Sequence, residues 1–209
     1  MELYFIVGKN LIFTCQKPKA KSQKPNWMKS TEPIITHLFK QKGIRNFEDA
    51  IEYVRHIPYG RNKSRSKFSL VLKDNCGTCS SKHALLKLYG DELGLVDVNL
   101  LLVYYRMSEV NTPAIGDALT RSGLDYIPEA HCILEYNHDH IDVTSSTSSF
   151  EAIRADVIEI KKINPSDVIE NKIAWHQEYI KSWIASTDIQ RSFAEIWAIR
   201  ERCIAQLTK

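Results

Sequence analysis

Two cysteines three residues apart stand directly before a helix-like pattern, in the stretch DNCGTCSSKHALLKLYGDELGL at residues 74–95. This spacing suits three kinds of chemistry: a redox dithiol of Cys76 and Cys79, half of a metal site, or one catalytic thiol. Each chemistry needs different partners elsewhere in the chain. The residues that could supply those partners therefore decide between the three interpretations.

The redox interpretation makes Cys76 and Cys79 the pair of a thiol–disulfide oxidoreductase. It is favoured by the position of the pair at a helix N-terminus, which lowers a thiol pKa from about 8.5. A thioredoxin-type fold would also need a strand hairpin shortly after a cis-proline. The candidate Thr112-Pro113 is followed by AIGDALTRSGL, which is helix-like. The context therefore disfavours the redox chemistry, which remains an alternative.

The metal interpretation would combine Cys76 and Cys79 with His138 and His140, or with His131. Zinc accepts two sulfur and two nitrogen ligands, but the histidines of such sites are usually three to five residues apart. His138 and His140 are only two apart. We therefore expect neither a metal nor another cofactor.

The third interpretation uses Cys79 alone, because backbone N–H groups and the positive end of a helix dipole favour a thiolate there. A nucleophilic thiol also needs a base and an acceptor that orients the base. His131 opens one strand of a predicted hairpin over residues 131–144, and Asp142 ends the next strand. The carboxylate on one imidazole nitrogen would leave the other nitrogen facing the sulfur. His83, one helical turn after Cys79, is a rival base.

The register of this hairpin makes Asp142 the less secure member of the set. A turn centred near residues 138–139 would place Asp142 opposite Glu135, about 13 Å along the strand from the partner of His131. Bringing Asp142 opposite His131 would require a tighter turn at Tyr136-Asn137, or a bulge.

In this order and context, the motifs resemble the transglutaminase-like superfamily. The resemblance covers roughly residues 45–150. The matching positions are Gly77, Cys79, Ala84 and Leu85 (G-x-C-x-x-x-x-A-L), His131 leading HCILEY, Asp142-Val143-Thr144, and Ile57–Tyr59 as the I-x-Y that often precedes the cysteine.

The resemblance implies a papain-like Cys-His-Asp core that hydrolyses, deamidates or transfers amides through a thioester, as a cysteine protease, other hydrolase or acyltransferase. Cys79 would be the nucleophile, His131 the base and later the acid, and Asp142 the orienter, with Cys76 a bystander. The implied partner is a protein or peptide with an amide or glutamine side chain. A catalytically inactive binding module of the same fold is a further alternative. His140 stands where the family often has tryptophan, and the backbone N–H of Cys79 is the default oxyanion donor.

The local patterns predict an α+β fold, with a catalytic helix packed on an antiparallel sheet and C-terminal helices. Expected strands lie on either side of a turn at residues 8–10, at 95–107, in the hairpin 131–144 and at 157–163, and residues 68–75 read as an extended lead-in. Expected helices run over 32–42 (capped by Thr31 and stopped by Gly43), 47–57 (capped by Asn46) and 80–93 (ended by Gly94).

The last 45 residues are expected to be helical. One predicted helix is capped by Ser166 and carries isoleucines through Ile184, and a second begins near Ile189. These helices would form an extension, residues 164–209, packed on a transglutaminase-like domain over residues 1–163.

Composition sets wider limits. With 209 residues, 44% of them hydrophobic, the chain fits one domain that can bury a core, and a net charge of +3 gives no reason to expect nucleic acid. The lysine-rich segment 16–30 reads as a solvated loop. No stretch is apolar enough for a bilayer, and the N-terminus does not resemble a secretory signal. Five cysteines without framework spacing favour a reducing, cytoplasmic setting.

Overall fold

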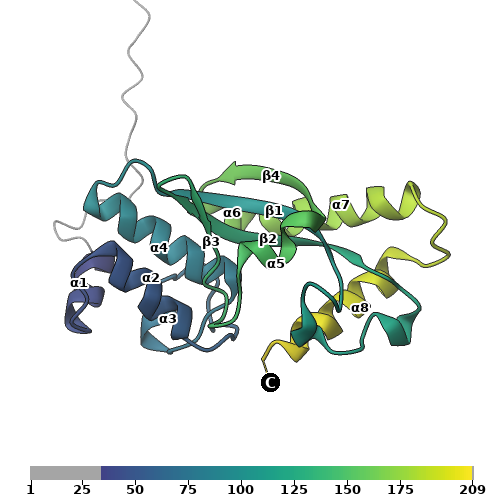
Figure 1. The fold of residues 1–209 in the computed structure, drawn as a ribbon, viewed down its shortest axis with the longest axis horizontal. Helices are drawn as coiled ribbons and strands as arrows, with labels where there is room; N and C mark the ends of the chain where they lie inside the picture. The colour runs from purple at the N-terminus through teal and green to yellow at the C-terminus, as the bar shows by residue number, and fades with distance from the viewer. Residues whose placement is uncertain (1–33, 209) are drawn as a thin grey trace, which may run out of the picture. The chain divides into compact units, whose positions relative to one another are not determined.

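A mixed α+β fold built on a four-stranded antiparallel sheet is seen in the computed structural model, which describes residues 34–208. The strand order is β3-β2-β1-β4 (Figure 1). The strands are β1 (Asn99–Met107), β2 (Ile127–Tyr136), β3 (Asp139–Ile141) and β4 (Val157–Ile163). The expected strands are confirmed as β1, which begins at Asn99 rather than at residue 95 and is buried along most of its length, and as β4, which pairs with β1 at the edge of the sheet.

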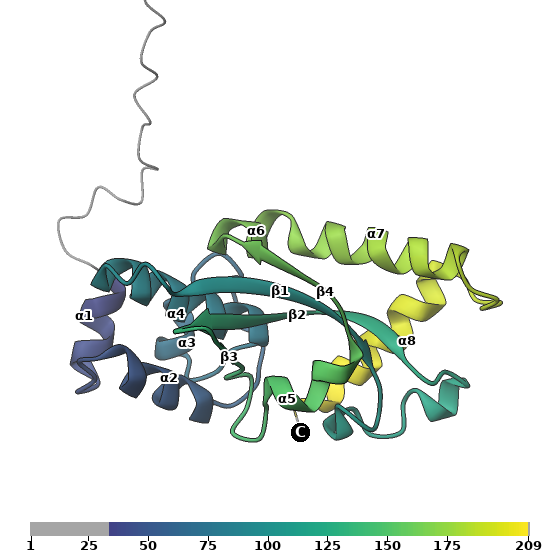
Figure 2. The ribbon, with the colours of Figure 1, turned by 45° about the horizontal axis from the view of Figure 1, so that its top comes forward.

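Both faces of the sheet are covered by helices, since side chains alternate along β1. Leu100, Leu102 and Tyr104 pack with one hydrophobic core, and Leu101, Val103 and Tyr105 pack with the other. The first core is completed by α1 (Ile34–Gln41), α2 (Phe47–His56), α3 (Leu70–Lys73) and α4 (Cys79–Leu93). The second is completed mainly by α5 (Phe150–Ile153) and α8 (Phe193–Gln206), and α7 (Lys172–Ala185) contributes to both (Figure 2).

Helix α4 begins at Cys79 because of a capping box formed by Thr78 and Ser81. The Thr78 side chain accepts from the Ser81 backbone N–H, and the Ser81 side chain accepts from the Thr78 backbone N–H. The helix ends at Gly94, whose φ of +77° is a left-handed conformation suited to glycine. The expected helix is thus confirmed, with its start one residue earlier.

Other caps follow the expected chemistry. The Asn46 side chain accepts from Asp49 N and starts α2, and Gly43 at φ +80° follows α1. The cap at Thr31, the N-terminal strands and the lysine-rich segment lie outside the described residues.

The extended lead-in expected at 68–75 is wrong, because residues 70–73 form the short helix α3. A helical turn lets the neighbours Val71 and Leu72 both reach the first core, whereas an extended chain would turn one of them away. The helix-like stretch 114–124 holds only two single 3₁₀ turns. Gly116 and Gly123 interrupt it with φ values of +65° and +63°.

The first C-terminal helix differs from the expectation in its cap and its continuity. Asn164, not Ser166, caps α6 (Pro165–Glu170), and the helix is interrupted at Asn171 before α7 begins. Ser192 caps α8, so Ile189 precedes that helix. The C-terminal helices belong to the same compact unit as the sheet. Among residues 34–208, no helix combines the length and the apolar character needed to cross a membrane.

Candidate active site

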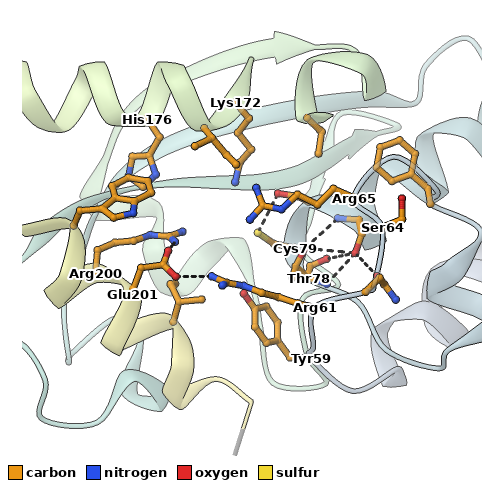
Figure 3. Close-up of a pocket in the computed structure, with 18 residues that line it drawn as sticks. Tyr59, Arg61, Ser64, Arg65, Thr78, Cys79, Lys172, His176, Arg200 and Glu201 are labelled. Carbon is orange, nitrogen blue, oxygen red and sulfur yellow. Dashed lines mark hydrogen bonds and ion pairs between the residues drawn. The ribbon is translucent and has the colours of Figure 1, made fainter. Parts of the chain in front are cut away.

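Cys79 is the first residue of α4 and lines a pocket of about 170 Å³ (Figure 3). The first N–H groups of a helix have no partner within the helix and carry its positive dipole end. Cys79 is a free, half-buried thiol. Its sulfur therefore lies where an anion is favoured and a ligand has access.

The strand-like segment before the pocket fixes the start of α4. Gly77 N donates to Pro58 O, and Gly60 N donates to Gly77 O, each at 3.1 Å. A Cβ on Gly77 would lie 2.9 Å from Lys82 Cγ and 3.1 Å from Val71 Cγ2. The glycine two residues before Cys79 is thus required by close packing.

His131 reaches the sulfur from the unpaired part of β2. Strand β3 pairs only with residues 134–136 of β2, so the described residues place no strand on that side of β2 before Leu134. The His131 imidazole and the Cys132 backbone N–H both lie close enough to the Cys79 sulfur to lower its pKa. His131 Nε2 is 2.8 Å from Asp142 Oδ2, which leaves Nδ1 for the sulfur.

Asp142 directly follows β3 and is buried, with an exposed fraction of 6%. Besides His131, its carboxylate accepts from the Thr144 backbone N–H at 2.9 Å. The turn is formed by Asn137 and His138, one residue before the expected centre, with Leu134 opposite Ile141. Asp142 is therefore not opposite Glu135. It contacts His131 although the hairpin has neither a bulge nor the tighter turn at Tyr136-Asn137 that we expected this contact to need.

Electrostatics favour an ionised thiol beside a charged imidazole. Burial alone would raise the pKa of Cys79, but the charges of Lys172 and His131 outweigh it and lower this pKa to about 6. Burial likewise opposes the charged form of His131, but Asp142 and the thiolate hold the pKa of His131 well above its usual value. The cationic His131 keeps the pKa of the buried Asp142 carboxyl far below its ordinary range. At neutral pH the three groups form a thiolate–imidazolium–carboxylate chain.

The rival base His83 is engaged by backbone groups on both ring nitrogens. Val143 N donates to its Nε2 at 2.9 Å, so Nδ1 carries the proton and donates to Cys79 O at 2.7 Å. Burial lowers the pKa of His83 to about 4. His83 therefore joins the start of α4 to the segment after Asp142 as a neutral link.

Lys82 makes a second link behind the site. Its buried ammonium donates to Ile57 O, to Val143 O at 3.1 Å and to Thr144 O at 2.9 Å. These bonds join α4 to the segment before the pocket and to the segment that follows Asp142.

In the described part of the chain, Cys76, His138 and His140 form no hydrogen bond or ion pair with Cys79, His131 or Asp142. Asn62 Nδ2 is 2.9 Å from Cys76 O and 3.5 Å from its sulfur. His138 sits in the exposed turn, and the ring of His140 lies 4.4 Å from that of Phe150. Within residues 34–208, no group of three or more histidine, cysteine or acidic side chains is placed to hold a metal ion.

Lys172 is the site residue that sequence reasoning missed. It begins α7, and its side chain reaches toward Cys79 (Figure 3). It is 93 positions from Cys79, and no local motif marks it. Lys172 occupies this position because α6 ends at Glu170 and α7 begins at Lys172.

Comparison of the chain with models of protein families, with curated proteins and with solved structures finds no match. The site geometry is therefore the basis for assigning a function.

Proposed function

We propose that this protein is a transglutaminase-like cysteine enzyme that cleaves or transfers amide bonds. The observation that carries the proposal is the 2.8 Å bond from His131 to the buried Asp142, with the same imidazole near enough to the Cys79 sulfur to lower its pKa. A thiol, a base and an orienter in this order are the parts of nucleophilic acyl transfer.

The chemistry follows from the protonation states. The Cys79 thiolate attacks the carbonyl carbon of an amide and forms a C–S bond. The His131 imidazolium gives its proton to the departing nitrogen as the C–N bond breaks, which leaves a thioester and a free amine or ammonia. Neutral His131 then takes a proton from water or from an acceptor amine, which attacks the thioester and restores the thiolate.

The tetrahedral intermediates need hydrogen-bond donors for their oxyanion. The backbone N–H of Cys79 lies at the start of α4 and has no helical partner. The Cys132 N–H on the unpaired side of β2 is a second donor near the sulfur. Two such backbone donors suit an oxyanion hole.

The proposal is tested with a casein digest incubated with the protein and hydroxylamine, an amine that traps thioesters. Mass spectrometry would report peptides that are cleaved, deamidated or converted to hydroxamates. We expect turnover by wild type and by Cys76→Ser, and none by Cys79→Ser or His131→Gln.

Loss of activity in Cys76→Ser would contradict the proposal and favour the thiol–disulfide oxidoreductase. A wild type as inert as Cys79→Ser on every amide would favour a binding module of the same fold.

A further inference from the structure

The cationic side chains that line the pocket beside Cys79 fall into two groups, those paired with a carboxylate and those that are not. Arg61 and Arg200 both bond to Glu201, at 2.8 and 2.6 Å, and Arg200 also makes two bonds to Glu129. Their charges are thus neutralised by protein carboxylates.

The other two cations of the pocket, Lys172 and Arg65, have no such partner. Neither side chain makes an ion pair or a side-chain hydrogen bond with any residue between 34 and 208. Lys172 is only 9% exposed, and Arg65 is exposed on the loop between α2 and α3. Figure 3 shows both side chains in the pocket around Cys79. Removing a cation from water is costly unless an anion offsets its charge, so this largely buried side chain favours an anion in the pocket.

In the resting site the Cys79 thiolate is an anion that offsets the charge of Lys172. That anion is lost during the proposed reaction. The sulfur becomes neutral in the thioester, and the proton of His131 leaves with the amine. Asp142 stays bonded to His131. The acyl-enzyme would therefore leave near Lys172 only the Glu129 carboxylate, which Arg200 already neutralises, unless the acyl group brings an anion of its own.

We infer that the acyl donor carries a carboxylate close to the reacting carbonyl, and that Lys172 binds this carboxylate with Arg65 contributing from the exposed side of the pocket. This inference rests on the proposed function and specifies its substrate class as an acidic acyl group, such as that of an acidic peptide. Arg61 does not take part, because Glu201 already pairs with it.

The test compares two alkylating reagents that differ in one group. Iodoacetate carries a carboxylate next to the reacting carbon, and iodoacetamide is its neutral counterpart. In both reactions the thiolate forms a C–S bond and iodide leaves. The ratio of the two rates therefore cancels any change in the thiolate fraction. The folded protein is alkylated at low salt, and the extent of reaction is read from the peptide that contains Cys79. The rate ratio for each protein is then divided by the rate ratio for glutathione.

We expect the ratio for wild type to exceed that of glutathione by about tenfold or more, since a cation a few ångströms away attracts an anion strongly at a partly buried site. Lys172→Met should lose most of this preference and Arg65→Gln part of it. Arg61→Gln is the matched control and should keep it. Arg65 is exposed, so its variant remains informative if Lys172→Met does not fold.

An unchanged ratio in both Lys172→Met and Arg65→Gln, with Cys79 still fast, would overturn the carboxylate inference and leave the catalytic proposal intact. That result would mean that Lys172 serves only the thiolate or the oxyanion, which affects both reagents alike. Slow alkylation of wild-type Cys79 by both reagents would overturn the activated nucleophile, and the substrate class with it.

Discussion

At the scale of single residues, the site depends on charges that compensate one another in a largely buried place. The Cys79 thiolate faces Lys172 and His131, and Asp142 balances His131 from the other side. Burial opposes the ionised forms of Cys79, His131 and Asp142, so each of these charges persists only because its neighbour is present. Substitution of one member should therefore change the protonation of the others.

His83 provides a residue-scale prediction that concerns positioning. His83→Ala removes the partners of Cys79 O and Val143 N, both enclosed behind the site. We expect a loss of about 2–4 kcal/mol in the free energy of unfolding, from an unpaired buried N–H and a cavity, measured by urea denaturation. The rate of Cys79 alkylation should fall as well, because the start of α4 is no longer held to the Asp142 segment.

His83→Gln serves as the rescue variant, since an amide can both donate and accept, and it should recover part of the loss. His37→Ala is the surface control, because within residues 34–208 the exposed His37 has a hydrogen bond only to the exposed Gln41 side chain. Equal stability of His83→Ala and His37→Ala would contradict the role of His83 as a link.

At the scale of elements, the turn between β2 and β3 determines where Asp142 lies. Asn137 and His138 both have positive φ, 52° and 69°, as a two-residue hairpin turn requires. Asparagine and histidine are among the residues that adopt positive φ most often after glycine, but both do so at a steric cost that glycine does not have.

His138→Gly should therefore stabilise the protein, by roughly 0.5–1 kcal/mol in the free energy of unfolding, because glycine adopts positive φ without steric cost. Thermal or urea unfolding would measure the change. The matched control is His140→Gly within β3, where glycine should destabilise. A less stable His138→Gly would show that the turn geometry is wrong, and with it the placement of Asp142.

Elements whose signals are local could be predicted from the sequence. The caps at Asn46 and Gly94 use a side chain or a backbone angle that one residue type provides. The hairpin was placed within one residue, but its register required knowing which residues take positive φ. The helix α3 could not be predicted, because Val71 and Leu72 are helical only through the core that both of them enter.

At the scale of the whole molecule, a buried ion pair joins the last helix to the strand that carries His131. Arg200 of α8 makes two bonds to Glu129 of β2, at 2.8 and 2.6 Å, and Glu129 is 3% exposed. Glu129 and His131 are two residues apart on β2, so their side chains lie on the same face of the sheet. This ion pair therefore holds α8 against β2, the strand that carries His131.

Arg200→Met should destabilise the protein by about 3–5 kcal/mol, because it leaves a buried carboxylate without its partner. Burial alone would raise the pKa of Glu129, but Arg200 outweighs it and lowers the pKa to about 2. The stabilisation from this carboxylate is therefore complete above its unfolded pKa of about 4.5 and is lost as pH falls through the lower folded value. Urea unfolding between pH 2 and 7 would measure both effects.

Arg121→Met is the control, since Arg121 pairs with Asp117 four residues earlier on the surface and should change stability by less than about 1 kcal/mol. If Arg200→Met were as mild as this control, or if its cost did not shrink in acid, the ion pair would not support α8.

Long-range partners are the part of the site that could not be predicted. Cys79, His131 and Asp142 were identified because each stands at a recognisable helix start or hairpin position. Lys172 and the Arg200–Glu129 pair have no such local signal, since their partners are supplied by packing of the C-terminal helices against β2. Only the folded molecule brings these charges to the pocket.

The pH dependence of Cys79 alkylation by iodoacetamide tests the central claim most directly, because the rate follows the thiolate fraction. The midpoint should lie near pH 6, as the lowered pKa of Cys79 requires, and should move upward in Asp142→Asn, where His131 loses the carboxylate that favours its charge. The Cys79→Ala variant shows which part of the alkylation comes from Cys79. A midpoint at or above about 8.5, the value of an ordinary thiol, would contradict the thiolate–imidazolium pair and the enzyme built on it.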